Sequence, residues 1–188
     1  MLGIAWSFLL PLFQIALFWF VFAGIMRARP YTDTEMPYII FLLSSFFFWL
    51  AFSESLLRSS NIIIENAELV KKVNFPNVIL PFAVTCYTYF HHMIGFFIFF
   101  IIYLFIGSPS PMFLLLIPVL FLQLIFSLGI GMLLSSLLPY LRDLGHILGQ
   151  VVQGLFFLSP IIYSIELIPE KFKIIIYPNP ITSFVSSY

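Results

Sequence analysis

Two adjacent histidines, His91 and His92, are the residues whose type most suggests chemistry within an apolar part of this chain. Neighbouring side chains on a helix point in different directions, so the two rings form a poor chelate. No Cys other than Cys86, and no Asp or Glu, occurs in residues 78–106. We therefore expect no metal site, but imidazoles bonded to neighbouring helices. The alternative is a membrane-embedded enzyme that uses His91 or His92.

Other catalytic arrangements are not apparent in the sequence. We expect no carboxylate at membrane depth that could act as a general base, and no Ser/His/Asp set can be argued. No Gly-rich phosphate loop of the GxxxxGKS or GxxxxGKT kind occurs. The chain is therefore predicted to be no enzyme and to bind no cofactor, and any ATP hydrolysis must come from a separate protein.

The composition indicates where these residues must lie. Of 188 residues, 62% are hydrophobic, 20% aromatic and 9% charged, and the mean hydropathy is +1.10. Soluble domains have about 25% charged residues, so a soluble enzyme and a disordered chain are excluded. The net charge of +0 indicates no nucleic acid partner, and the single cysteine excludes an intrachain disulfide. The sequence predicts an all-α, multi-pass integral membrane protein.

The charged residues divide the chain into apolar stretches. They fall in four windows, at 27–35, 54–72, 142–143 and 166–173. A membrane-spanning helix needs about 20 apolar residues, and the longest apolar stretch is divided by Pro109 and Pro111, because proline ends helices. We predict a single domain of residues 1–188 with five transmembrane helices, at residues 5–26, 37–57, 78–106, 112–138 and 146–165.

Small residues and the end of the chain give two further expectations. Glycines in the fourth and fifth spans permit close helix contact, and we expect them to pack within the chain. These are Gly129, Gly131, Gly145 and Gly149. Residues 166–188 carry four charges and several prolines, so they are too short and too broken to cross a membrane. They are predicted to form a short hairpin in one leaflet.

Residues 61–73 form the most informative loop. On a helix, Ile62, Leu69 and Val70 share one side. The opposite side carries the polar residues Asn61, Glu65, Glu68, Lys71 and Lys72, and Glu68 and Lys72 have the spacing of an i,i+4 ion pair. This pattern favours a helix on the lipid headgroups, and a helix that docks a soluble partner is the alternative. Lys and Arg are divided four against four between the two sets of loops, so charge predicts no orientation.

Short segments in a fixed order carry a resemblance to a known family. They are LGIAW (2–6), VKKVNFPNVILP (70–81), RDLGHI (142–147), SPIIY (159–163), IPEK (168–171) and NP (179–180). In this order and spacing they resemble the permease subunits of type-two ABC exporters for cell-surface polysaccharides such as O-antigen, teichoic acid or capsule. The resemblance covers essentially the whole chain.

The resemblance implies a transport subunit of the inner (plasma) membrane that exports a lipid-linked glycan. Such permeases form homodimers and bind two copies of a separate ABC ATPase, which alone binds ATP. In this family the loop between the second and third spans is cytoplasmic and carries a coupling helix against the ATPase. The corresponding residues here are Asn61, Glu65, Glu68, Lys71 and Lys72.

The resemblance also assigns the other loops to a side of the membrane. Cytoplasmic loops would contain Phe75, Pro76, Arg142 and Asp143. An external re-entrant segment would contain Ser159, Pro160, Tyr163, Pro169, Asn179 and Pro180. Family members have an amphipathic segment before LGxxW and a sixth span after NP. We therefore expect residues 1–188 to be truncated at both ends, without the sixth span, and to insert without supporting export. A type-two ABC permease for a drug or a lipid is the alternative within transport.

Overall fold

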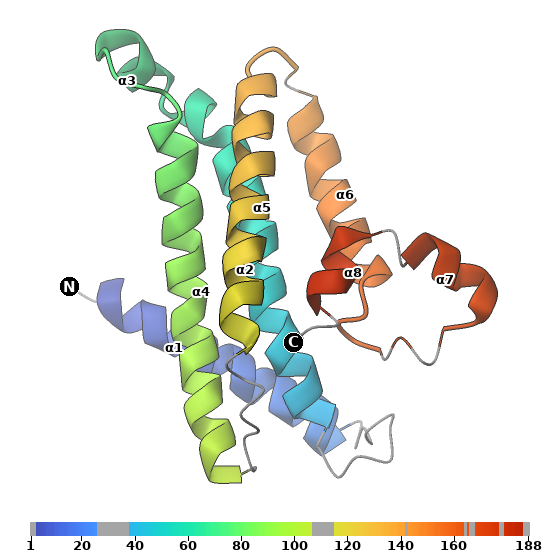
Figure 1. Ribbon diagram of the computed structural model, residues 1–188. Coiled ribbons are helices and arrows are strands. Elements are labelled where there is room, and N and C mark those ends of the chain that lie inside the picture. The colour runs from blue at the N-terminus through green and yellow to red at the C-terminus, as the bar shows by residue number, and fades with distance from the viewer. Residues whose placement is uncertain are drawn as a thin grey trace.

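The computed structural model describes residues 3–25, 38–106, 115–141, 143–163, 165, 168–176 and 179–185. All regular secondary structure in these residues is helical, which confirms the all-α fold class (Figure 1). Arg142 and Tyr188 lie outside the described residues.

Three long helices form the centre of the fold. They are α2 (Tyr38–Glu65), α4 (Ile79–Ile106) and α5 (Leu116–Leu137). At 1.5 Å rise per residue each is at least about 33 Å long, and each is apolar enough to cross a hydrocarbon layer of about 30 Å. The helices pack side by side in all three pairings. They confirm membrane-length helices at the second, third and fourth predicted spans.

α2 continues to Glu65, beyond the predicted end of its span at residue 57. No glycine or proline occurs between Tyr38 and Glu65, and Arg58 donates to Glu54 over 3.0 Å as an i,i+4 ion pair along the helix. The hydroxyls of Ser55 and Ser60 each donate to the carbonyl three residues earlier. The charged and hydroxyl side chains therefore make this part of α2 less apolar, but they do not end the helix.

Small and polar side chains fill the contact between the three long helices. Along α5 the buried residues are Gln123, Ser127, Gly131 and Ser135, which repeat every four residues. Tyr89 of α4 bonds to the Ser127 hydroxyl over 2.6 Å, and Gln123 donates to the Phe48 carbonyl over 3.3 Å. Because lipid is as apolar as leucine, close approach and hydrogen bonds hold such helices together rather than hydrophobic burial.

The glycine prediction is confirmed at two positions. A Cβ atom at Gly131 would lie 2.6 Å from the Ser59 hydroxyl oxygen, and one at Gly145 would lie 3.6 Å from Leu138 and 3.8 Å from Asn61. Gly129 and Gly149 have no such neighbour within 4 Å, so for them the prediction of packing within the chain is wrong. Gly95 of α4 is also tightly packed, because a Cβ there would lie 2.6 Å from Phe47 and 3.0 Å from Pro11.

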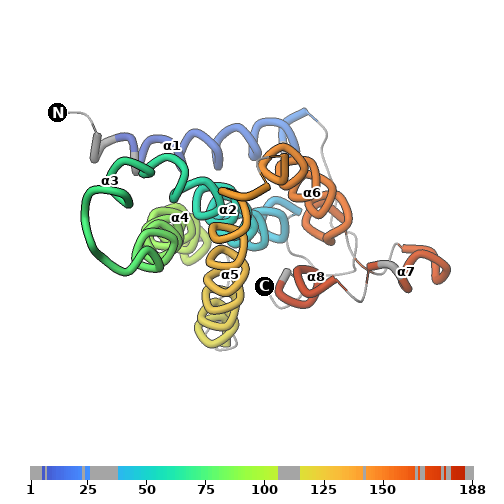
Figure 2. The backbone as a smooth tube through the Cα atoms, turned by 90° about the horizontal axis from the view of Figure 1, so that it is seen from above, coloured from blue at the N-terminus to red at the C-terminus, as the bar shows by residue number. Residues whose placement is uncertain are grey.

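The first helix lies across the bundle. α1 (Gly3–Phe18) continues into a short π-helix, η1 (Trp19–Ile25). In Figure 1 it runs obliquely past α4 and α2, and in Figure 2 it is seen from the side while α4 is seen end-on. Ile15 and Phe18 pack on a core cluster of Leu43, Phe47 and Phe99. The helix predicted at 5–26 is therefore present, but its apolar part, Phe8–Phe22, is shorter than the three long helices.

The last quarter of the described chain packs on α2 and α5 through α6 and α8. α6 (Leu144–Leu158) is about 22 Å long, shorter than the hydrocarbon layer, and is followed by α7 (Glu170–Ile176) and α8 (Pro180–Val185). Ile161 and Ile181 enter a core cluster with Trp49, Phe52 and Leu56 of α2. Phe184 of α8 packs on Phe126, halfway along α5, with ring centres 5.7 Å apart. The chain therefore turns back after α6 and returns to the middle of the bundle.

Candidate functional site

One end of the bundle gathers most of the predicted cytoplasmic residues. The end of α2, the start of α4, the end of α5 and the start of α6 meet there, at the top of Figure 1. α3 (Ala67–Lys72) projects beside them. Phe75 is half-buried and Pro76 exposed just before α4, whose first turn forms as Ile79 N donates to the Pro76 carbonyl over 3.0 Å. Asp143 precedes α6 at the same end.

The predicted helix over residues 61–73 is two helices in the structure. Asn61 and Glu65 belong to α2, and the chain bends at Asn66, whose backbone angles are φ −108° and ψ 26°. The Asn66 side chain donates to the Ile62 carbonyl over 2.9 Å, and such side-chain bonds compete with regular helix geometry. The prediction of one continuous amphipathic helix is therefore wrong, and α3 by itself carries Glu68, Lys71 and Lys72.

α3 has no buried residue. Lys72 and Glu68 form the expected i,i+4 ion pair, at 2.9 Å. Ile62 and Val70 are half-buried and Leu69 is 43% exposed, so the apolar side that these three residues were expected to share is only partly covered in this chain. A six-residue helix with both its charged and its apolar side open is suited to contact another protein.

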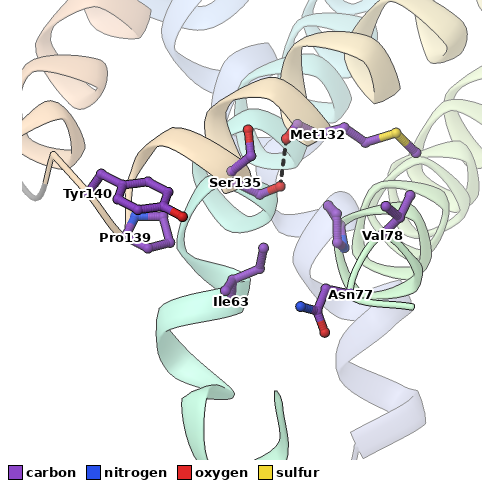
Figure 3. Close-up of a pocket in the computed structure, with 9 residues that line it drawn as sticks. Ile63, Asn77, Val78, Met132, Ser135, Pro139 and Tyr140 are labelled. Carbon is purple, nitrogen blue, oxygen red and sulfur yellow. Dashed lines mark hydrogen bonds between the residues drawn. The ribbon is translucent and has the colours of Figure 1, made fainter. Parts of the chain in front are cut away.

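A pocket of about 360 Å³ opens at the same end, between α2, α4 and α5. Figure 3 shows Ile63, Asn77, Val78 and Tyr140 around it, with the Ser135 hydroxyl donating to the Met132 carbonyl over 2.8 Å. Val78 and Tyr140 are 57% and 86% exposed. The pocket is lined mainly by apolar residues, whereas α3 at the same end carries Glu68, Lys71 and Lys72.

A second group of chemical residues lies near the middle of α2 and α4. His92 Nε2 is 2.6 Å from Glu54 Oε2, and its side chain is 11% exposed. The same carboxylate accepts from Arg58 through its other oxygen. The expectation of a His bonded to a neighbouring helix is confirmed at His92, whose partner is a carboxylate of α2. Glu54 had been grouped with the loop charges, yet it lies inside a continuous membrane-length helix.

His91 points away from this pair, as expected for adjacent positions on a helix. Its ring stacks on Tyr87 with centres 6.2 Å apart and meets the His92 ring edge-on. The Arg58 guanidinium lies 5.8 Å from the centre of the Tyr87 ring, a cation–π contact. Within the described residues, no group of three or more His, Cys, Asp or Glu side chains is arranged to hold a metal ion. We call Glu54, Arg58, Tyr87, His91 and His92 the α2–α4 polar cluster.

A charged side chain at the centre of a membrane helix costs about 2.5–3.5 kcal/mol on insertion scales. The Arg58 and Glu54 side chains are 51% and 37% exposed in this chain, so the chain itself does not shield them. The sequence signal that could have found the cluster is the i,i+4 spacing of Glu54 and Arg58 directly after sixteen uncharged helical residues, 38–53.

The residues predicted for a re-entrant segment are partly brought together. Asn179 donates to the Ser159 hydroxyl over 3.2 Å, and its own side-chain oxygen accepts from Ile181 N over 3.0 Å. Asn179 thus caps α8, in which Pro180 takes the first position, where its missing N–H costs nothing. Ser159 and Pro160 are buried. The two segments SP and NP therefore form one joint, twenty residues apart in sequence.

Tyr163 and Pro169 lie outside this joint. The Tyr163 hydroxyl donates to the Phe157 carbonyl over 2.8 Å and folds the chain back on the end of α6. Pro169 is exposed, and its carbonyl accepts from Phe172 N over 2.9 Å in the first turn of α7. Tyr38, the first residue of α2, donates to the Ile162 carbonyl over 2.5 Å. The segment after α6 is therefore held at the part of α2 farthest from α3.

The geometry combines a bundle of membrane-length helices, an exposed short helix at one end and a folded-back segment near the other. The family model for ABC-2 type transporters matches residues 1–188. The chain belongs to the ABC-2 type transporter family. It is therefore an integral membrane transport subunit rather than an enzyme, and its family pairs with ABC ATPases.

Several relatives of this ABC-2 permease carry a more specific name. Two proteins of Klebsiella pneumoniae named "O-antigen export system permease protein RfbA" are 31% and 32% identical, over 100% and 99% of this chain and 71% of their own length. A protein of Myxococcus xanthus with the same name is 26% identical over 100% of this chain and 71% of its own length. The resemblance drawn from the short segments is thus confirmed over the whole chain.

Proposed function

We propose that this ABC-2 permease is the membrane-spanning subunit of an ATP-driven exporter that moves a lipid-linked polysaccharide of the O-antigen class across the inner membrane. The observation that supports this proposal best is the similarity along the entire chain to three permeases named for O-antigen export. A match confined to one motif would indicate only the general transporter family.

The proposal assigns ATP to a partner. A homodimer of the permease binds two copies of an ABC ATPase at the end that carries α3, which makes this end cytoplasmic. The exposed charges of α3 and its open Leu69 are compatible with a docking helix, and Phe75, Pro76 and Asp143 lie at the same end of the bundle. ATP binding would push α3 and shift the long helices as rigid elements between two states.

The proposal places the other end of the bundle on the external side of the membrane. α1–η1 and α6 would be the first and fifth spans, and α7 with α8 would be a re-entrant segment reached from the external side. The return of Phe184 to the middle of α5 supports a segment that enters the membrane and does not cross it.

A complementation experiment tests the proposed function. The gene of this permease is expressed with its ABC ATPase in a strain whose own O-antigen permease is deleted, and surface glycan is measured by immunoblotting of intact cells. We expect surface glycan with the active ATPase when residues 1–188 are expressed within a chain that also supplies the family's amphipathic segment and sixth span. We expect only intracellular lipid-linked glycan when residues 1–188 are expressed alone or when the ATPase phosphate-loop lysine is replaced. Lipid-linked glycan that stays inside the cell with the longer chain and the active ATPase present and correctly inserted would contradict the proposal.

A further inference from the structure

The contact between α2 and α4 differs along its length. In the half away from α3 the helices are tightly packed, since the Phe48 and Phe96 rings are centred 4.6 Å apart and a Cβ atom at Gly95 would lie 2.6 Å from a ring of α2. The bond between Glu54 and His92 follows next toward α3. Beyond this bond a pocket of about 320 Å³ lies between the two helices. Its lining residues are Arg58, Ile62 and Glu65 of α2 and Ala83, Val84 and Tyr87 of α4.

The part of α2 beside this pocket contains bonds that favour bending. We call residues 55–65, the part of α2 beyond Glu54, the α2 arm. Three buried hydroxyls of the arm each donate to the carbonyl three residues earlier, over 2.8, 3.3 and 2.9 Å, and they belong to Ser55, Ser59 and Ser60. Side-chain bonds of this kind compete with the regular backbone bonds and often bend helices. Because α3 follows the arm directly after Asn66, a force on α3 reaches the arm first.

An unpaired hydroxyl of α4 lies close to the arm. Thr85 is fully buried, and its hydroxyl has no hydrogen-bond partner among the described residues. The hydroxyl oxygens of Ser59 and Thr85 would lie 2.6 and 3.6 Å from a Cβ atom at Gly131, so both are close to the same point on α5. A buried hydroxyl without a partner is unfavourable, and a movement of the arm by a few ångström toward α4 would give Thr85 a partner in Ser59. Gly131 has no side chain that would hinder this movement.

We propose that the α2 arm closes on α4 when the ATPase pushes α3, with the Glu54–His92 bond as the pivot. Closing narrows the pocket and brings the Ser59 hydroxyl within hydrogen-bond distance of the Thr85 hydroxyl. The Thr85 hydroxyl is thus unpaired in the open form seen here and paired in the closed form, while the packed halves of α2 and α4 move together. The use of the ATPase rests on the proposed function, whereas the pairing of Ser59 with Thr85 is a property of this chain.

Cross-linking in two nucleotide states tests the closure. The longer chain of the complementation experiment, in a Cys86→Ala background, is purified with its ATPase in lipid nanodiscs. The pair Ile62→Cys with Val84→Cys lies across the pocket, and bifunctional thiol reagents of graded length are applied without nucleotide and with ATP and vanadate. We expect a shorter reagent to link this pair when ATP and vanadate are bound. The matched pair Phe48→Cys with Phe96→Cys, in the packed half, should need the same reagent in both states.

A second measurement needs neither the ATPase nor the glycan. Thr85→Val replaces the unpaired hydroxyl by a methyl group, so it should raise the melting temperature of the permease in detergent by a few degrees. The matched control is Thr88→Val, because Thr88 is equally buried but its hydroxyl donates to the Val84 carbonyl over 2.9 Å. This control should not raise the melting temperature. Thr85→Val, unlike Thr88→Val, should also reduce the effect of ATP and vanadate on cross-linking, since the closed form loses its bond to Ser59.

The outcomes separate this inference from the proposed function. If the Ile62–Val84 pair needs the same reagent in both states, or if the Phe48–Phe96 pair responds equally, no closure about a pivot occurs and the inference is overturned while glycan export stands. A melting temperature that Thr85→Val does not raise above that of Thr88→Val would overturn it as well. A pocket that closes with ATP in a permease that exports no glycan in the deletion strain would overturn the proposed function and leave the closure of the α2 arm standing.

Discussion

At the residue scale, the closest contacts of the fold rest on side chains that are small or absent. Gly131 lets α5 approach Ser59 of α2, and Gly95 lets α4 approach Phe47 and Pro11. Buried hydroxyls near these contacts bond to each other, as Tyr89 and Ser127 do, or to carbonyls of their own helix, as Ser59 does, whereas the Thr85 hydroxyl beside Gly131 has no hydrogen-bond partner within the described part of the chain. Single atoms at such positions therefore decide whether three apolar helices fit together.

Gly131→Ala should destabilise the protein. The new Cβ would lie 2.6 Å from the Ser59 hydroxyl oxygen, and forcing an extra group into a packed contact typically costs about 1–3 kcal/mol. The melting temperature in detergent, followed by size-exclusion chromatography of heated samples, should fall. Gly129→Ala, which has open space around it, should leave the melting temperature unchanged. Adding Ser59→Gly to Gly131→Ala should raise the melting temperature again. If it does not, the Ser59 side chain is not what the new Cβ collides with.

Asn179→Ala should loosen the joint between the SP and NP segments. It removes the bond to Ser159 and the cap of α8, and loss of such a cap costs about 1 kcal/mol. Hydrogen exchange at residues 179–185 should become faster while that of α4 stays the same. Ser136→Ala, which removes an exposed hydroxyl on α5, serves as the control. Equal exchange in both variants would mean that other contacts hold α8.

At the element scale, the bend at Asn66 separates a packed helix from the exposed helix that we propose to dock the ATPase. α2 is buried along most of its length, whereas α3 has no buried residue. A short helix that makes few contacts with its own chain is stabilised little by those contacts. A partner that covers α3 would therefore stabilise this helix. The same arrangement allows α3 to be pushed without unpacking the bundle.

Changes on α3 and at the last residue of α2 should weaken binding of the ATPase. The double reversal Glu65→Lys with Glu68→Lys should reduce co-purification modestly, because exposed charges contribute under about 1 kcal/mol each. Leu69→Asp should reduce it more, since burying a leucine side chain is worth about 1.5–3 kcal/mol. The reversal Glu170→Lys with Lys173→Glu on α7 should have no effect. Unchanged co-purification in all variants would leave α3 as a helix on the headgroups.

At the scale of the whole molecule, two sets of loops lie at opposite ends of the bundle. α3 and the turn before α6 share one end, as the alternation of spans predicts, and Tyr38 holds the segment after α6 toward the other. The even division of Lys and Arg leaves the orientation undecided by charge. Only the proposed contact with the ATPase makes the α3 end cytoplasmic.

Cysteine labelling should show this orientation. In a Cys86→Ala background, Lys72→Cys should react with a membrane-impermeant maleimide only after the cytoplasmic side is opened. Lys171→Cys, on α7, should react in intact spheroplasts. Both positions are exposed, so access and not burial determines the labelling. The reverse pattern would overturn the orientation and the cytoplasmic assignment of α3 with it.

The sequence by itself determined the helical class, the apolar helices of membrane length and the family. Each of these follows from local information, since hydropathy and the positions of Pro and Gly are properties of neighbouring residues. The order of the short segments was sufficient for the family because it extends over the entire chain. The α3 loop and the SP and NP segments were also recognised as motifs from the sequence, and their sides of the membrane stay predictions.

Only the tertiary structure decided which distant residues meet. Glu54 and His92 are 38 residues apart, and their contact depends on the register in which α2 packs on α4. The same holds for Ser59 against Gly131 and for Asn179 against Ser159. The bend at Asn66 was also missed, because the amphipathic pattern continues through a residue whose side chain bonds to the backbone of the preceding turn. Periodicity gives the face of a helix, but packing determines what that face touches.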